Sequence, residues 1–378
     1  MRVAIVGGGI AGLATAIGLQ RADAEVTVFE RGDGSVVGAG ISLFGNALVA
    51  LDSIGRGAAL RELSGGPVTS FRVGQRTPDG SWLATTPTDA VGELHVVHRH
   101  DLNAMLLDGL RPGTVRYGVR ASASDDGVVE VPGSDGERFD LVVAADGIRS
   151  GIRSRWDLDT GLRYSGYAAW RGVTAGPVDL GGEAGETWGR QHRFGIVPLA
   201  DGRVYWFAVA SMPEGTVFDA ERAELLRRFA GWHHPIAEVV RATDVIVRHN
   251  IHDLAKPLRR YIRGRGALVG DAAHAMTPNL GQGGGQSLED AATLAALLRP
   301  LAAQPNADPP EVFKALERYD ALRRPRSQAI ASRSRTMGAV AHTPNRLVVR
   351  VRNTLLRLVP DAILVRQLEG MLRWSPPS

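Results

Sequence analysis

The sequence predicts an α/β fold in which segments of a mostly parallel sheet alternate along the chain with segments of a mostly antiparallel sheet. An apolar run, a glycine turn and a helical pattern follow one another at residues 2–21, and the same order returns at residues 267–298. This order is typical of open parallel sheets. Between the two units, residues 164–211 are rich in strand-forming and aromatic residues. The 378-residue chain has room for one large domain or two moderate ones.

The first unit has the spacing of a dinucleotide-binding turn. Residues 2–6 predict a strand that is buried on both faces. Three glycines with the spacing G-x-G-x-x-G follow it, at Gly7, Gly9 and Gly12. The first permits a sharp turn, the second lets the backbone approach a pyrophosphate, and the third lets the helix pack closely. A helix over residues 10–21, beginning at Ile10 and Ala11, would direct its free N–H groups at the phosphates. The alternative is a glycine-rich turn without a ligand.

A second strand, at residues 25–29, leads to an acidic residue. Glu30 lies about 20 residues past the glycines, where a carboxylate can hold ribose hydroxyls. Because this carboxylate would repel a 2′-phosphate, we expect FAD or NAD here rather than NADP. Arg31 and the glycine-rich residues 32–40 follow, and such a loop can lie over a bound cofactor.

The next part of the chain mixes helices with short strands. Residues 45–61 predict a helix with a break at Gly55. The alternating segments and turns of residues 67–97 predict antiparallel hairpins. The helix that follows Arg99 has Asp101 as its expected cap.

A parallel strand is expected to rejoin the first sheet at residues 139–145. Asp146 comes directly after it, at the carboxyl end of the strand, where open α/β sheets bind their ligands. A carboxylate there could accept hydrogen bonds from a ribose or from backbone N–H groups. An ordinary Asp-Gly turn is the alternative reading.

The aromatic-rich stretch predicts a second, mostly antiparallel sheet, followed by a helix pair at residues 219–242. Arg193 lies among apolar residues of a strand in this stretch. If its side chain points into a cavity, it can bind an anionic substrate; otherwise it is a surface arginine. The region contains four histidines, His233, His234, His249 and His252. They lack the spacing of metal ligands, so we expect no metal site there.

The second glycine unit repeats the physics of the first. A short apolar strand ends at Asp271, and a helix is expected from about residue 287 to 298. Asp271 would bond ribityl hydroxyls of a flavin, and the helix start would stabilise negative charge on its pyrimidine edge. Between Asp271 and this helix, the conformational freedom of the glycine-rich backbone would let a flat ring lie against the chain. The residues concerned are Gly281, Gln282, Gly283, Gly284 and Gly285.

The motifs GGGIAG, AADGIRS and LVGDAAHAMTPNLGQGGGQSLEDA, together with Arg99, resemble those of the class A FAD-dependent aromatic hydroxylases. This family includes salicylate and 3-hydroxybenzoate hydroxylases, bacterial urate hydroxylase and zeaxanthin epoxidase. The resemblance runs from residue 1 to about residue 335. It implies the p-hydroxybenzoate-hydroxylase fold, with a Rossmann-type FAD-binding domain interleaved with an antiparallel-sheet substrate domain and a C-terminal helical segment.

The same resemblance implies a domain division and a set of cofactor contacts. The FAD-binding domain would comprise residues 1–66, 98–160 and 255–340, the substrate domain residues 67–97 and 161–254, and the C-terminal helices residues 341–378. FAD contacts are implied at Glu30, Arg31, Arg99, Asp271 and residues 281–285, and with less certainty at Ser42 and Val119.

The segment from Arg193 to Tyr205 is similar to bacterial urate hydroxylase, in which the matching Arg and Tyr belong to the active site. This likeness implies that Arg193 binds substrate and that Tyr205 polarises or deprotonates a substrate hydroxyl or N–H. Pro278 would pack near the flavin. Urate is one of several candidate substrates, because residues of such pockets diverge quickly.

The implied reaction is an NAD(P)H-dependent monooxygenation, in which one atom of O₂ reaches an electron-rich aromatic or heteroaromatic ring through a flavin C4a-hydroperoxide. NAD(P)H would bind transiently, without a Rossmann domain of its own. The alternatives are an epoxidase acting on a non-phenolic substrate, an FAD oxidase or dehydrogenase that releases H₂O₂, and a non-catalytic flavoprotein. A flavin halogenase is disfavoured because the motif W-x-W-x-I-P is absent.

Composition limits the remaining possibilities. The absence of cysteine excludes disulfides and thiolate metal sites, and it fits a cytoplasmic protein, as does an N-terminus that is itself a strand. The basic character comes almost entirely from arginine, without a basic block interleaved with aromatics, so we expect no nucleic-acid partner. Residues 346–373 predict two amphipathic helices broken at Pro360, suited to a weak contact with a membrane or a second copy. Packing against the protein's own body is the alternative.

Overall fold

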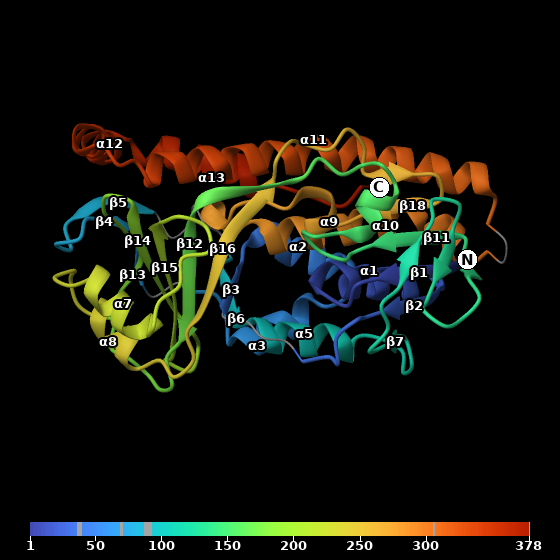
Figure 1. Ribbon diagram of the computed structural model, residues 1–378, viewed down its shortest axis with the longest axis horizontal. Helices are drawn as coiled ribbons and strands as arrows, with labels where there is room; N and C mark the ends of the chain where they lie inside the picture. Colours follow the sequence, from blue (N-terminus) through green and yellow to red (C-terminus); the bar gives the residue numbers. More distant parts are fainter. Residues whose placement is uncertain (36–39, 69–70, 87–92, 305–306, 378) are drawn as a thin grey trace.

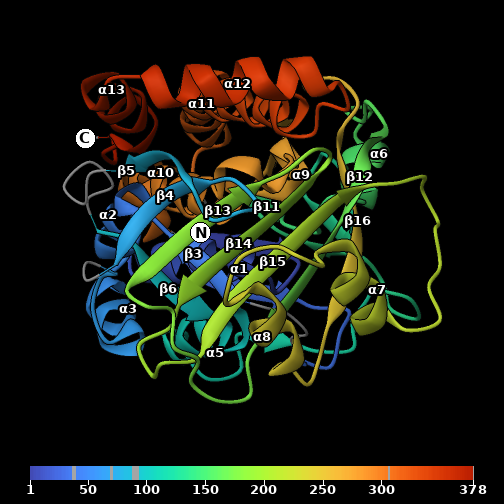
Figure 2. The ribbon, with the colours of Figure 1, turned by 90° about the vertical axis from the view of Figure 1, so that its left-hand side faces the viewer.

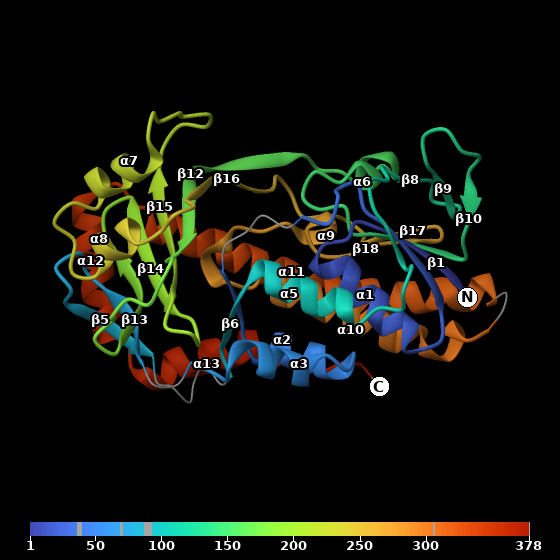
Figure 3. The ribbon, with the colours of Figure 1, turned by 90° about the horizontal axis from the view of Figure 1, so that it is seen from below.

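The computed structural model describes residues 1–35, 40–68, 71–86, 93–304 and 307–377. Its two main sheets lie toward opposite ends of the long axis of the molecule (Figures 1 and 3). The first sheet has six strands in the order β17-β18-β11-β1-β2-β7. All of its pairs are parallel except the one between β17 and β18. The strands are β1 (Arg2–Val6), β2 (Glu25–Phe29), β7 (Val115–Arg116), β11 (Leu141–Ala144), β17 (Ile262–Arg263) and β18 (Gly266–Leu268).

Helices α1 (Ile10–Gln20) and α10 (Gly283–Ala302) pack against each other beside this sheet. Their close approach depends on Gly18, where a Cβ atom would lie only 2.6 Å from the Cβ of Ala295. Apart from the exposed Arg2, the residues of β1, β11 and β18 are buried, as expected for a parallel sheet covered by helices. The expected strand at residues 139–145 therefore does rejoin the first sheet, as β11 beside β1.

The second sheet has seven strands in the order β16-β12-β15-β14-β13-β4-β5 and is antiparallel apart from the pair β13–β4. Helices α7 (Glu221–Arg228) and α8 (Ile236–Arg241) cover its outer face, on the near side of Figure 2. Its inner face is turned toward the first sheet. The strands are β4 (Arg72–Arg76), β5 (Trp82–Thr86), β12 (Leu162–Val173), β13 (Glu183–Trp188), β14 (His192–Pro198), β15 (Val204–Ser211) and β16 (Val247–Leu254).

The longest helix, α11 (Pro309–Ala341), runs alongside both halves of the molecule (Figure 1). This helix is not among the elements predicted above, although Asp308 followed by Pro309 is a helix-start signal. Pro325 lies inside this helix, and a proline at an interior position normally predicts the end of a helix. Its omission matters because α11 supplies two arginines to the candidate site.

Smaller elements complete the fold. Strands β3 (Gly40–Leu43) and β6 (His95–His98) form a two-stranded sheet, and β8 (Ser122–Ala123), β9 (Val128–Glu130) and β10 (Glu137–Arg138) form a three-stranded one. The remaining elements are α2 (Gly45–Ser53), α3 (Gly57–Ser64), α5 (Arg99–Asp108), α6 (Gly151–Arg155), α9 (Asp271–His274), η1 (Pro278–Leu280), α12 (Arg346–Leu358) and α13 (Asp361–Leu372).

Several local expectations need correction. Asp101 is not the cap of α5, because the helix begins earlier and the side chain of His98 accepts the capping hydrogen bond. Helix α10 begins at Gly283, within the glycine run, rather than at residue 287. The first hairpin strand begins at Arg72. Residues 36–39 of the glycine-rich loop and residues 69–70 and 87–92 of the predicted hairpins lie outside the described residues. The break at Gly55 and the two C-terminal helices separated at Pro360 are confirmed. No helix in the described part of the chain is long and apolar enough to cross a membrane.

Candidate functional site

The carboxyl ends of β1, β11 and β18 bring the two glycine units together. Gly7 turns with a φ of +112°, and a Cβ atom there would lie 2.2 Å from the carbonyl oxygen of Ala145. A Cβ atom on Gly270 would lie 2.7 Å from the Cβ of Ala11. The first glycine turn therefore sits between the ends of β11 and β18. Glycine is required at both positions, because any side chain would collide with a neighbouring segment.

The three glycines of the first turn have different surroundings. Gly12 packs against the turn itself, since a Cβ atom on it would lie 1.9 Å from the carbonyl oxygen of Gly7. Gly9 has nothing within 4 Å of its Cβ position, and no side chain caps the helix that starts at Ile10. The first N–H groups of α1 are thus presented to open space, as a phosphate group requires.

Glu30 joins the glycine turn to the loop that follows β2. One carboxylate oxygen accepts from the N–H of Gly8 and the other from the N–H of Gly32, each at 2.6 Å. Val119 lies next to it and donates its N–H to the carbonyl oxygen of Glu30 at 2.9 Å. Arg31 is exposed beside them. The structure brings these three predicted residues together, with carboxylate lone pairs left to accept from hydroxyl groups.

Two more carboxylates lie at strand ends in the same place. Asp146 accepts the N–H of Ile152 at 3.2 Å with one oxygen, while its other oxygen is buried and has no partner among the described residues. Asp271 is exposed at the first position of α9. A buried acceptor without a donor is costly. A ligand rich in hydroxyl groups would supply a donor for this oxygen.

The loop after η1 is shaped for close contact with a flat ring. Gly281 adopts a φ of +63°, and a Cβ on Gly284 would lie 2.8 Å from the side chain of Ile41. Gly283 has open space at its Cβ position, and no side chain caps α10. The neighbouring side chains that wall this loop are Ile41 and Leu43 of β3 and Phe44 after it, whereas Ser42, between the first two on the strand, points to the opposite face.

Gln282 is the one residue of this loop whose long side chain is buried. Its Oε1 accepts from Asn46 at 3.0 Å, and its Nε2 has no partner among the described residues. Asn46 in turn donates to Glu289 at 2.7 Å. An amide donor held in a fixed position beside a glycine loop is suited to a carbonyl or ring-nitrogen acceptor.

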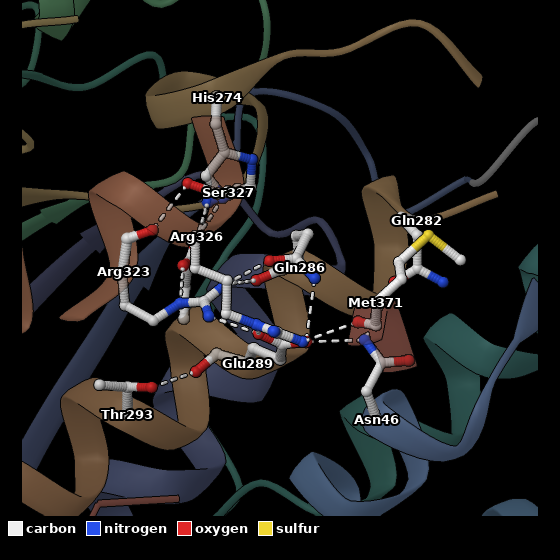
Figure 4. A network of polar contacts seen from close by, with 12 residues as sticks. Asn46, His274, Gln282, Gln286, Glu289, Thr293, Arg323, Arg326, Ser327 and Met371 are labelled. Atoms are coloured by element: carbon white, nitrogen blue, oxygen red, sulfur yellow. Dashed lines mark hydrogen bonds and ion pairs between the residues drawn. The ribbon is translucent and has the colours of Figure 1, made fainter. Parts of the chain in front are cut away.

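Behind the loop lies a fully buried charge network (Figure 4). Arg323 of α11 donates to Asp290 at 2.7 Å, to Glu289, and to Gln286 at 2.7 Å. Both carboxylates are completely inaccessible to solvent. His274 approaches Asp290 at 2.6 Å. Burial acts to raise the pKa of Asp290, but the opposing effects of His274 and Arg323 prevail and lower it.

The network also reaches the C-terminal segment. Arg326 donates to both oxygens of Glu289, at 2.7 and 2.9 Å, and to the carbonyl oxygen of Met371 at 3.0 Å. Segments far apart in the sequence, α2, α10, α11 and α13, are thus joined directly beneath the loop (Figure 4). This arrangement fixes the start of α10, whose first N–H groups have no capping side chain, while the N–H of Gly281 in the loop donates to the carbonyl oxygen of Pro278 at 3.0 Å.

On the opposite side of the loop, Arg193 is buried in the inner face of the second sheet and is only 1% exposed. It donates to Asn279 of η1 at 2.6 Å and to Glu186 at 3.2 Å, and its Nε has no partner in the described part of the chain. The surface-arginine alternative is therefore wrong. Through Asn279 the structure also places Arg193 near Pro278, the neighbouring residue of η1.

Tyr205 faces the same way as Arg193. The two residues lie on the same face of adjacent strands, and a Cβ on Gly40 of β3 would lie 2.4 Å from the Tyr205 ring. Burial raises the pKa of its hydroxyl, an effect that nearby Arg171 only partly opposes. The phenol is therefore protonated at neutral pH.

Arg99 lies where the two halves meet. It is exposed at the start of α5. Burial lowers the pKa of His249 on β16, and the positive charges of Arg171 and Arg99 lower it further.

The sequence analysis missed His342, which follows α11. Its ring stacks on Tyr167 with centroids 4.4 Å apart, and its Nε2 is buried without a partner among the described residues. Burial, together with the charges of Arg193 and Arg352, lowers the pKa of His342 to about 3. No spacing in the sequence links residues 167, 193 and 342, so only the fold could identify this cluster.

Comparison with known proteins supports a flavoprotein assignment. Residues 95–334 match the family described as an FAD binding domain, and residues 5–42 match an NAD(P)-binding Rossmann-like domain. The chain is 35% identical to the aurachin C monooxygenase/isomerase of Stigmatella aurantiaca, covering 100% of this chain and 99% of that protein. It is also 35% identical to the 2-heptyl-3-hydroxy-4(1H)-quinolone synthase of Pseudomonas aeruginosa, covering 96% and 95%.

A solved structure agrees over nearly the whole length. Klebsiella pneumoniae HpxO complexed with FAD and uric acid superimposes with a TM-score of 0.87 at 28% identity, covering 98% of this chain and 96% of that one. The chain belongs to the class A FAD-dependent aromatic hydroxylases and is an FAD-dependent monooxygenase.

Proposed function

We propose that the protein uses NAD(P)H and O₂ to insert one oxygen atom into an electron-rich, fused heteroaromatic ring that contains nitrogen, of the quinolone type. The observation that carries this proposal is the position of Arg193 and Tyr205. Both lie on the inner sheet face, and they abut η1 and β3, which wall the glycine loop. A flat ring between that face and the loop would lie against the cofactor.

Two of the similar proteins support this substrate class. One relative is named for a heptyl-hydroxy-quinolone product, and the solved structure holds uric acid. Both molecules are flat bicyclic rings that carry carbonyl oxygens and ring N–H groups. Such a ring needs hydrogen-bond donors for its oxygens and an apolar surface for its faces. The inner sheet face offers both, with Arg193 and Tyr205 as donors beside Phe207 and Val209.

The cofactor would be held by residues already described. The glycine turn (Gly7, Gly9, Ile10, Ala11, Gly12) would bind the pyrophosphate, and Glu30, Arg31, Ser42, Arg99, Val119, Asp146, Asp271 and residues 281–285 would line the rest of FAD. Bound FAD supplies the redox chemistry that activates O₂. The chain itself positions the ring, keeps water away and handles protons.

The two substrate residues would have separate roles. Arg193 would direct its unpartnered Nε toward a substrate oxygen and stabilise negative charge there. Because the pKa of Tyr205 is raised, its hydroxyl would polarise a substrate oxygen or nitrogen as a donor. Pro278 would hold the substrate side of the loop rigid beside Asn279. An electron-rich form of the ring is what an electrophilic oxygen requires.

An absorbance spectrum of the purified protein, followed by NADH and NADPH oxidation against phenols, purines and quinolones under ¹⁸O₂, tests the proposal. We expect a yellow protein whose NAD(P)H oxidation rises with a bicyclic N-heteroaromatic compound and whose product gains one ¹⁸O atom. Stoichiometric H₂O₂ without labelled product would favour an oxidase. Labelled epoxide from a non-aromatic compound would favour an epoxidase. A colourless protein that cannot be loaded with FAD would contradict the whole assignment.

Two further parts of the proposal concern the cell. A cytoplasmic location is supported by the absence of cysteine, and cell fractionation tests it. The C-terminal helices α12 and α13 would make a weak contact with a membrane or with a second copy, since they carry exposed apolar residues.

A further inference from the structure

Helix α12 has an exposed apolar stripe, formed by side chains whose spacing in the sequence places them on one side of the helix. At about 100° per residue, Leu347, Val348, Val351, Leu355 and Leu358 fall within an arc of about 100° on one side of the helix. Each of these side chains is between 48 and 71% exposed. Soluble surfaces rarely gather so many large apolar side chains in one place. In Figure 2, α12 runs along the outer edge of the molecule.

The opposite side of α12 is the one that packs on the protein. Arg352 is buried there, where it donates to the carbonyl oxygen of Ala341 at 3.0 Å and lies 5.3 Å from the ring of Trp188. Leu356 and Val359 face the β4–β5 hairpin across a small cavity. Because the helix is already fixed by this side, the apolar stripe is not needed to attach it to the body.

Arginines line one edge of the stripe. The same geometry puts Arg346, Arg350 and Arg357 within an arc of about 40° beside the apolar side chains, and α12 has no acidic residue. No ion pair involving these three arginines occurs among the described residues. Arg357 also lines the cavity of about 200 Å³ that it shares with Arg72 and Trp82. The edge therefore offers cations without anions of its own.

We propose that α12 docks on an anionic phospholipid surface, with the apolar stripe entering the boundary between headgroups and acyl chains and the arginine edge meeting lipid phosphates. This pattern of an apolar stripe bordered by arginine is what binds a helix flat at an interface. A second copy of the chain fits less well, because two such helices would bring arginine near arginine with no carboxylate on either α12. The surface stands on the geometry of α12 alone and does not depend on the proposed substrate.

Vesicle flotation of the full-length, FAD-loaded protein tests this proposal. We expect binding to phosphatidylcholine vesicles that contain phosphatidylglycerol, with weaker binding to phosphatidylcholine alone and at raised salt. The double variant Val351→Asp/Leu355→Asp should lower the bound-to-free ratio at least about tenfold. Its matched control is Val217→Asp/Val245→Asp, which adds the same charge at exposed apolar positions elsewhere and should bind as the parent does.

Charge reversal separates the two halves of the surface. In Arg350→Glu/Arg357→Glu, the ratio of binding to anionic vesicles over binding to phosphatidylcholine vesicles should fall by about tenfold or more. The control variant Arg259→Glu/Arg260→Glu, which changes two arginines exposed elsewhere, should keep the ratio of the parent. Point variants are preferable to truncation, since removing the C-terminal segment would also remove the Met371 carbonyl that Arg326 contacts. The flavin spectrum of each variant reports whether it is folded.

Two results would overturn the proposal. One is full-length protein that stays unbound in the presence of anionic vesicles. The other is Val351→Asp/Leu355→Asp that floats as well as the parent. If the parent is instead a dimer in sedimentation analysis and this variant is a monomer, without vesicle binding in either, the stripe is an interface between copies.

Discussion

Two clusters of buried charge flank the glycine loop, and they differ in how completely they are satisfied. In the network behind the loop, every nitrogen of Arg323 and every oxygen of Glu289 and Asp290 has a partner, and only the residues that bond to these carboxylates from outside, His274 at Nδ1 and Asn46 at Oδ1, keep an unpartnered atom among the described residues. On the sheet face, by contrast, Arg193 keeps its Nε and His342 keeps its Nε2 without a partner among the described residues. The first cluster therefore stabilises the packing of the helices behind the loop, whereas the second has polar atoms that are available to hydrogen-bond a ligand. We propose that this difference separates a scaffold for the cofactor from a surface for the substrate.

The largest effect should come from breaking the satisfied cluster. Arg323→Leu leaves two buried carboxylates without their main cation, so we expect the free energy of unfolding to fall by about 3 to 5 kcal/mol, with loss of bound FAD. Chemical denaturation followed by flavin fluorescence measures both. The neighbouring Arg324→Ala, which removes only the ion pair with Asp320, is the control and should cost about 0.5 kcal/mol. Equal effects for the two variants would contradict the scaffold role.

Removing one cofactor carboxylate tests the scaffold without unfolding it. Glu30→Ala deletes the acceptor of the Gly8 and Gly32 N–H groups, so we expect FAD affinity to fall by about 10- to 100-fold. Fluorescence titration of the apoprotein with FAD provides the measurement. The control is Asp33→Ala, three positions after Glu30 in the same loop. This variant loses only the hydrogen bonds to Ser35 and should bind FAD as the parent does.

Tyr205→Phe tests the substrate surface by removing a single hydroxyl. Because the pKa of this phenol is raised and we propose that it acts as a donor to the substrate, we expect kcat to fall by about tenfold, with FAD affinity and KM nearly unchanged. Steady-state kinetics with the compound identified in the panel would show this split. A rise in KM with unchanged kcat would instead make the hydroxyl a binding group only.

The smallest effect concerns the pH dependence of stability. The pKa of His342 is about 3 in the folded protein and near 6.5 when unfolded, so the unfolded state takes up a proton first as the pH falls. Stability from this group is therefore complete above pH 6.5 and is lost on acidification, by about 1 kcal/mol between pH 6.5 and 5.5. His342→Asn should remove that increment from denaturation curves measured at the two pH values. An unchanged pH dependence would mean that His342 is not held neutral by burial.

How far the sequence could predict this molecule depends on whether a feature is made of backbone or of side chains. The glycine turns were predictable from spacing alone, because their glycines serve the path of the backbone, which packs against Ala145 at Gly7 and adopts a φ of +63° at Gly281. Arg193 was ambiguous in sequence, because alternation along a strand does not reveal which face is buried. His342, Asn279 and Arg323 come from distant segments, and the fold alone brings them to the loop. Helix α11 was missed because Pro325 interrupts its pattern.

The most direct test is to titrate Arg193→Met with substrate at saturating FAD and to follow the flavin absorbance. The parent protein and Arg190→Met are titrated in the same way. Arg190 is the matched control because it lies three residues from Arg193 and its side chain is exposed. The account predicts that Arg193→Met binds FAD as tightly as the parent but needs at least about tenfold more of the heteroaromatic compound for half of the spectral change. Arg190→Met should match the parent. An Arg193→Met titration that superimposes on the parent curve would contradict the assignment of the sheet face as the substrate surface.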